Sequence, residues 1–131
     1  MKVKSIYITL AAKDLNKTKD FWTRLGFLFN EENSSDKSLC LVLNEGAMYS
    51  MFIRQDYFNA FTNRMISDDS SGQMLIAIEV ESKERLEEIV NLAILNGGTR
   101  YKESMHCDSL CYDSFADPDG HKWEIMYANG V

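Results

Sequence analysis

The sequence predicts an α+β fold made of two βαβββ modules. Two observations predict it. The alternation typical of strands and the apolar stripe typical of helices follow one another in the same order in both halves. The halves also keep the same offset at their start, since Tyr7 corresponds to Leu75 and Asp14 to Ser82 at equal spacing. A chain of 131 residues fits one domain.

The first half opens with a strand at residues 6–12, where large apolar residues alternate with smaller or polar ones. Asp14 predicts a helix N-cap, because its carboxylate can accept the free N–H groups of a first helical turn. Apolar residues at helical spacing follow, and Gly26 ends the helix. The remaining elements of this half are three strands, at residues 27–30, 38–43 and 47–53.

The second half repeats this order. It begins with a strand at residues 74–80, followed by a helix that Ser82 caps and Gly97-Gly98 ends. The turn Asp117-Pro118-Asp119-Gly120 joins its last two strands, because Pro118 presets φ and Gly120 permits a positive φ. The strands after the helix are predicted at residues 99–103, 110–115 and 122–127.

Residues 55–72 join the two halves. They begin with aromatic residues and end in a polar run, which predicts a short helix followed by a flexible connector. The chain is therefore predicted to be a single domain over residues 1–131, whose modules span residues 1–54 and 73–131.

Charge and cysteine content exclude several classes of function. The net charge is −6, and an acidic surface repels phosphate backbones, which disfavours a nucleic-acid partner. No stretch approaches the roughly 20 apolar residues that a membrane span needs. The three cysteines, Cys40, Cys107 and Cys111, are odd in number and too few for a disulfide scaffold. We therefore expect reduced thiols and a cytoplasmic protein.

Two segments of the sequence carry specific patterns. The first is Ile8-x-Leu10-x-x-x-Asp14-Leu15-x-x-x-x-x-Phe21-Trp22-x-x-Leu25-Gly26-Phe27, and the second is Phe115-x-Asp117-Pro118-Asp119-Gly120-His121-x-Trp123-Glu124-Ile125. With the repeat, they resemble the vicinal oxygen chelate superfamily of glyoxalase I, bleomycin- and fosfomycin-resistance proteins and extradiol dioxygenases. The chain looks most like the small bacterial glyoxalase-like proteins. The resemblance implies the glyoxalase/bleomycin resistance/dihydroxybiphenyl dioxygenase fold, in which two modules form a paired half-barrel cleft.

Members of this superfamily often hold a divalent metal in the cleft. The resemblance places the four ligand positions at Tyr7, Ser50, Leu75 and Glu124. A catalytic zinc usually takes three protein ligands plus water, whereas only Glu124 among these four is a good ligand at neutral pH. We therefore predict no cofactor and no metal at these positions. This disfavours the metal-dependent chemistry of glyoxalase I and of the dioxygenases.

Glu124 is the candidate catalytic residue. Alternation directs its side chain, with those of Tyr7 and Leu75, away from the apolar faces that meet the helices and into the cleft. An apolar cleft would raise the pKa of the Glu124 carboxyl into the range of a general base. The alternative is a carboxylate that hydrogen-bonds Tyr7 or Lys122 and does no chemistry.

Other residues are expected to shape the same cleft. Alternation along residues 47–53 directs Ser50 and Phe52 into it, among aromatic neighbours that suit a flat or apolar ligand. Tyr112 offers a polar group. The candidate ligand-binding residues are therefore Tyr7, Ser50, Phe52, Leu75 and Tyr112.

Three functions remain open from the sequence. The first is a glyoxalase-like protein that binds a small organic ligand, with a metal-independent lyase or isomerase activity that uses Glu124 as base. The second is a protein of the resistance type that sequesters a drug or metabolite without turnover. The third is a metalloenzyme, a lyase or dioxygenase, whose displaced metal site would draw on His106, Cys107, Cys111 or His121. For an enzyme, glyoxalase-type chemistry is favoured over a dioxygenase. The aromatic content of 11% also predicts a homodimer.

Overall fold

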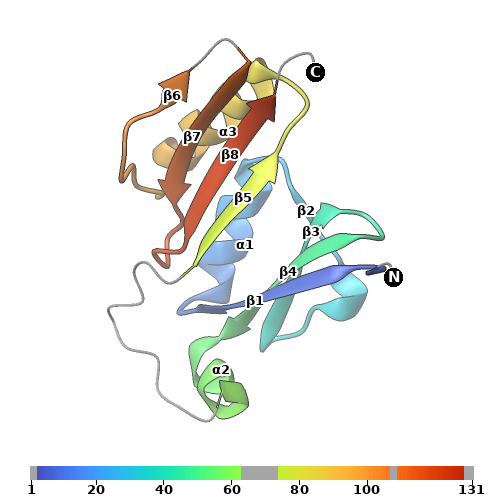
Figure 1. Cartoon of the computed structure of the whole chain (residues 1–131). Coiled ribbons are helices and arrows are strands. Elements are labelled where there is room, and N and C mark those ends of the chain that lie inside the picture. The colour runs from blue at the N-terminus through green and yellow to red at the C-terminus, as the bar shows by residue number, and fades with distance from the viewer. Residues whose placement is uncertain (1–2, 63–73, 107–108, 129–131) are drawn as a thin grey trace. The chain divides into compact units, whose positions relative to one another are not determined.

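The computed structural model of the chain describes residues 3–62, 74–106 and 109–128 (Figure 1). The chain forms two compact units, unit 1 (Met1–Ser67) and unit 2 (Asp68–Val131). Each unit holds one four-stranded sheet in which the first strand runs parallel to the last. The predicted α+β class and the repeated order of strands and helix are confirmed.

Unit 1 follows the predicted order, and its sheet has the strand order β1-β4-β3-β2. One short 3-10 helix, η1, was not expected. It forms because the Asn30 side chain accepts hydrogen bonds from the N–H groups of Glu32 and Asn33. The elements are β1 (Ile6–Ala12), α1 (Leu15–Arg24), β2 (Leu28–Phe29), η1 (Glu31–Asn33), β3 (Ser38–Asn44), β4 (Met48–Arg54) and α2 (Gln55–Thr62).

Helix α1 begins and ends where the sequence predicts. The Asp14 carboxylate accepts the Lys17 N–H at 3.1 Å, which satisfies one free donor of the first turn. After the helix, Gly26 takes a φ of 96°, a conformation that side chains with a Cβ rarely adopt. The buried Trp22 of α1 packs against Phe52 of β4, with ring centroids 6.1 Å apart. The core of unit 1 therefore lies between α1 and the sheet.

Unit 2 repeats this topology with the strand order β5-β8-β7-β6. Its helix α3 begins where Ser82 accepts the Arg85 N–H at 3.0 Å, as predicted. The fully buried Phe115 and Trp123 lie in register on β7 and β8, the two strands that α3 contacts. The elements are β5 (Leu75–Glu79), α3 (Lys83–Leu95), β6 (Met105–His106), β7 (Leu110–Ala116) and β8 (Lys122–Ala128).

The strand predicted at residues 99–103 is wrong. Only Thr99 pairs with β7, through a bridge to Ala116, and regular pairing resumes at β6. Gly98 lets the chain leave α3 very close to β7, since a Cβ there would lie 3.0 Å from the Ala116 carbonyl oxygen of β7. Beyond Thr99, charged side chains form ion pairs with neighbouring strands in place of a ladder of backbone hydrogen bonds.

A buried carboxylate organises the turn between β7 and β8. Asp117 Oδ1 accepts the N–H groups of Asp119 and His121, and Asp117 Oδ2 accepts Trp123 Nε1–H at 3.1 Å. Gly120 has a φ of 86°, so the predicted role of this glycine is confirmed. Burial raises the pKa of Asp117 to about 6, although the nearby His121 and the N–H donors lower it. Within the described residues, no helix is long and apolar enough to cross a membrane.

Candidate functional site

The strand register of unit 2 gathers several of the predicted site residues on one side of its sheet. We call the side away from α3 the distal face of unit 2. Ser114, Glu124 and Ala77 lie next to one another across β7, β8 and β5. The distal face carries Leu75, Ala77, Tyr112, Ser114, Lys122 and Glu124. The sequence therefore placed Glu124 and Leu75 on a common face correctly, and the structure adds Tyr112, whose direction the sequence did not fix.

Glu124 is held by a lysine that the sequence analysis did not identify. Lys102 Nζ lies 2.8 Å from Glu124 Oε2, whereas the expected partners were Tyr7 or Lys122. The Glu124 side chain is 16% exposed and that of Lys102 is 40% exposed. The hydrogen bond to Glu124 raises the pKa of Lys102. No sequence signal pointed to Lys102, because its position depends on the course of the chain between α3 and β6.

Aromatic side chains lie beside the lysines of this face. Lys102 Nζ lies 5.5 Å from the ring centroid of Tyr112, and Lys122 Nζ lies 5.3 Å from that of Tyr101. The Tyr112 hydroxyl donates to the sulfur of Met105. These contacts place the ammonium groups of both lysines beside aromatic rings.

Ser114 adds a polar group to the same face. It is fully buried, and in the part of the chain that the structure describes its hydroxyl has no hydrogen-bond partner. Its register partner on β8 is Glu124. A buried hydroxyl without a partner is uncommon in native proteins, because its desolvation is not compensated.

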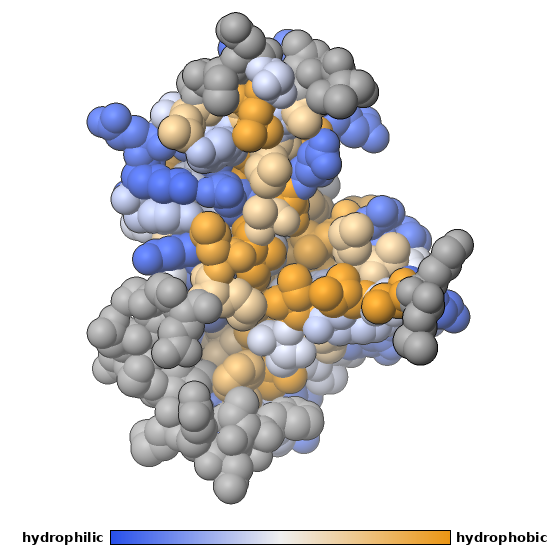
Figure 2. All heavy atoms as spheres, viewed as in Figure 1, coloured by the Kyte–Doolittle hydropathy of each residue, from blue (hydrophilic) through white to orange (hydrophobic). Residues whose placement is uncertain are grey.

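Unit 1 places its predicted site residues on two different sides of the sheet. Tyr7 is 51% exposed and stacks on Tyr49, with ring centroids 4.7 Å apart, on the side away from α1. Figure 2 shows apolar side chains gathered along β1, where Ile6 is also half-exposed. The position of Tyr7 agrees with the predicted alternation.

The expected orientation of Ser50 and Phe52 is wrong. Both are fully buried and share a face with Ile8 and Leu10, their register partners on β1. Ser50 Oγ donates to the Ile8 carbonyl oxygen at 3.1 Å, and Phe52 packs against α1. The alternation along this strand was read correctly, but its two sides were exchanged, because only the pairing with β1 fixes them.

The four family ligand positions do not fit a divalent metal. Leu75 has no donor atom, Ser50 is buried with its hydroxyl engaged, and Glu124 is paired with Lys102. Among the described residues, no group of three or more His, Cys, Asp or Glu is placed to hold a metal. Of the residues considered for a displaced site, Cys107 and the side chain of His106 lie outside the described part. Cys111 lies in register with Tyr127, on the opposite side of the sheet from Glu124.

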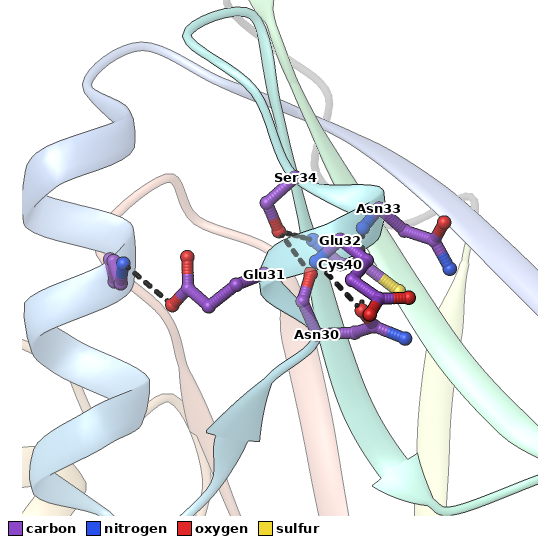
Figure 3. A network of polar contacts seen from close by, with 7 residues as sticks. Asn30, Glu31, Glu32, Asn33, Ser34 and Cys40 are labelled. Carbon is purple, nitrogen blue, oxygen red and sulfur yellow. Dashed lines mark hydrogen bonds and ion pairs between the residues drawn. The ribbon is translucent and has the colours of Figure 1, made fainter.

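A separate cavity of about 540 Å³ opens beside α1 in unit 1. Two of its lining residues, Glu31 and Ser34, make polar contacts that are drawn in Figure 3. Glu31 pairs with Lys19 at 3.0 Å, and Ser34 accepts the Cys40 N–H. Its lining includes Lys13, Lys19, Glu31, Asp36, Leu39 and Arg54. Because Lys19 is paired with Glu31 and Arg54 with Asp56, we assign no ligand to this cavity.

Comparison with known proteins agrees with this architecture. A family model described as Glyoxalase/Bleomycin resistance protein/Dioxygenase superfamily matches residues 4–125. A hypothetical protein from S. aureus superposes with a TM-score of 0.81 at 23% identity, over 98% of this chain and 96% of the other. A glyoxalase/bleomycin resistance protein/dioxygenase family enzyme from Burkholderia phytofirmans gives a TM-score of 0.78 at 20% identity, over 93% and 96% of the two chains.

A third structure is named for a resistance function. The fosfomycin resistance protein FosX from Listeria monocytogenes superposes with a TM-score of 0.69 at 19% identity, over 98% of this chain and 96% of the other. No curated protein matches this chain in sequence. At these identities the structural matches establish the fold and leave the activity open.

Proposed function

We propose that this chain, which belongs to the Glyoxalase/Bleomycin resistance protein/Dioxygenase superfamily, binds a small organic ligand at the distal face of unit 2. The observation that carries the proposal is the placement of Glu124. Its carboxylate, on a side chain that is 16% exposed, lies between Ala77 and Ser114, whose hydroxyl has no hydrogen-bond partner within the described residues. A few polar groups converging among apolar and aromatic side chains are typical of binding sites.

Glu124 would act as the base or as a hydrogen-bond acceptor. Its Oε2 is engaged by Lys102, so Oε1 is the oxygen that would accept a proton from the ligand. The chemistry would be a proton transfer of the lyase or isomerase kind, and it needs no metal at the family positions. Tyr112 and Leu75 lie on the same face and would contact the ligand.

Sequestration without turnover is the second candidate. It is favoured by the ion pair, because Lys102 already engages one of the two carboxylate oxygens of Glu124 at 2.8 Å. A solved relative of the same fold is named a fosfomycin resistance protein. A metalloenzyme with a displaced site ranks last, since Cys111 lies on the side of the sheet opposite Glu124.

The substitution Glu124→Gln tests the proposal, with Glu79→Gln as its matched control. Glu79 is an exposed carboxylate on the same face, in register with Met126. A panel of small aldehydes, ketones, carboxylic acids and amines is screened by thermal shift against all three proteins. We expect a ligand that raises the melting temperature of the wild type and of Glu79→Gln but not of Glu124→Gln. An equal rise in all three proteins would place binding elsewhere.

Product analysis separates the two candidates. An enzyme converts the bound ligand, and Glu124→Gln abolishes the conversion. A sequestering protein returns the ligand unaltered after stoichiometric binding, which proton NMR of the released ligand detects.

We also propose that the protein is a homodimer. Large apolar side chains remain half-exposed on both units, among them Tyr7 and Leu75 at 51% each. Such residues are enriched at interfaces between subunits. Light scattering of the purified chain should give twice the mass of one chain, and the mass of a single chain would contradict the proposal.

A further inference from the structure

We propose that the distal face of unit 2 selects ligands that carry an oxyanion, a carboxylate or phosphoryl group, through Lys102 and Lys122. In this arrangement Lys102 supplies, beside Glu124, the positive charge that a divalent metal supplies at the family positions. This inference rests on the proposed function, because it names the ligand class of the same site.

The position of Lys102 supports this role. Its ammonium group contacts Glu124 at 2.8 Å and lies over the ring of Tyr112, yet the side chain remains 40% exposed. An ammonium group has three N–H donors, and Glu124 engages one of them. A ligand oxygen can therefore reach Lys102 from solvent while the ion pair with Glu124 stays intact.

Lys122 provides a second positive charge on the same face. It lies two residues before Glu124 on β8, so both side chains project to the same side of the sheet. Its ammonium group is held over the ring of Tyr101, the residue next to Lys102. Within the described residues, Lys122 forms no ion pair.

Lys102 and Lys122 bring positive charge to one part of an acidic chain. The chain has a net charge of −6, but Lys102 and Lys122 face a single paired carboxylate, Glu124. Glu79 is a further carboxylate on the face, and it lies four residues along β5 from Leu75, the register partner of Lys122. Two ammonium groups around one carboxylate leave an excess positive charge that matches one oxyanion.

Ser114 gives the site a neutral donor. Its buried hydroxyl has no partner in the described part of unit 2 and lies across from Glu124. A hydroxyl can donate a hydrogen bond to an oxyanion. Because Ser114 is fully buried, a ligand oxygen reaches it only when neighbouring side chains of the face move.

The test is a titration of the full-length protein with inorganic phosphate and with acetate, followed by amide NMR at constant ionic strength. We expect saturable shifts at residues of the distal face, such as Ala77 and Glu124. Lys102→Met and Lys122→Met should each weaken binding roughly tenfold to a hundredfold, since each removes a charge-assisted contact. Lys102→Arg should keep most of the affinity. The control Lys17→Met, an exposed lysine on α1 of unit 1, should bind as the wild type does.

The two probes distinguish the ligand chemistries. Saturable binding of phosphate alone assigns a phosphoryl group, and binding of acetate assigns a carboxylate. If Lys102→Met fails to fold because Glu124 loses its partner, the titration is repeated with the double variant Lys102→Met/Glu124→Gln and with the single variant Lys122→Met.

Several results would overturn the inference. They are the absence of saturable shifts with either probe, or equal affinities in the wild type, Lys102→Met and Lys122→Met. The proposed function survives such a result if a neutral ligand from the thermal-shift panel still depends on Glu124. The proposed function itself fails when no ligand of any charge distinguishes Glu124→Gln from Glu79→Gln.

Discussion

The buried carboxyl of Asp117 makes a prediction that depends on pH. Asp117 is 4% exposed, and burial raises its pKa from 3.8 to about 6 in the folded protein. Its protonated form is therefore favoured by folding. The stability that this form contributes is fully present below the unfolded pKa, near 3.8, and is lost as the pH rises through about 6.

The size of the effect follows from the pKa shift. A shift of about two units corresponds to about 3 kcal/mol, because each unit is worth roughly 1.4 kcal/mol. The variant Asp117→Asn is neutral at every pH and keeps the shape of the side chain. The free energy of unfolding of the wild type, relative to that of Asp117→Asn, should fall by about 3 kcal/mol between about pH 4 and pH 7.

The assay is urea denaturation of both proteins at a series of pH values, followed by circular dichroism. Taking the difference between the two proteins cancels the titration of all other carboxyl groups. The variant Asp20→Asn, which replaces a side chain that is 68% exposed, is the matched control and is measured over the same pH series. The reasoning is refuted if the Asp117→Asn difference is independent of pH. It is also refuted if the wild type gains stability as the pH rises, since the N–H donors would then outweigh burial.

Three substitutions test the packing of the two units by urea denaturation. Gly98→Ala should destabilise unit 2 by about 1–3 kcal/mol, because its Cβ would meet two backbone oxygens, those of Ala93 at 2.8 Å and Ala116 at 3.0 Å. Phe52→Ala should cost about 3–5 kcal/mol without affecting ligand binding, because its ring is fully buried against α1. Asp14→Ala should cost about 0.5–2 kcal/mol through loss of the N-cap of α1.

For each of these three substitutions, a different result would contradict the structural explanation. A neutral Gly98→Ala would mean that α3 and β7 separate easily at this point. Loss of ligand binding in a folded Phe52→Ala protein would restore the original expectation that Phe52 faces the ligand. An unchanged stability of Asp14→Ala would show that the hydrogen bond to Lys17 contributes nothing.

Local sequence patterns predicted most helices and strands, because helix caps and turns depend on residues that are close together in the sequence. The N-caps at Asp14 and Ser82 and the turn glycine Gly120 each act within a few residues, so the sequence alone located them. The family motif likewise placed Glu124 on the last strand, on a common face with Leu75.

Long-range register decided what the sequence did not predict. The side of the sheet on which Ser50 and Phe52 lie depends on the pairing of β4 with β1, and a strand pattern read alone cannot choose between its two faces. The partner of Glu124 was missed for a similar reason. Lys102 precedes it by 22 positions and reaches it only because the chain after Gly98 leaves the edge of the sheet.

The central claim is that Glu124 and Lys102 form a ligand site without a metal. Elemental analysis by mass spectrometry tests this claim most directly. Untagged, gel-filtered wild type and Glu124→Ala are measured after incubation with nickel, zinc, manganese and ferrous iron. We expect no stoichiometric divalent metal in either protein, because Lys102 forms an ion pair with the Glu124 carboxylate and Leu75 has no atom that can coordinate a metal. A stoichiometric metal in the wild type that is lost in Glu124→Ala would contradict it.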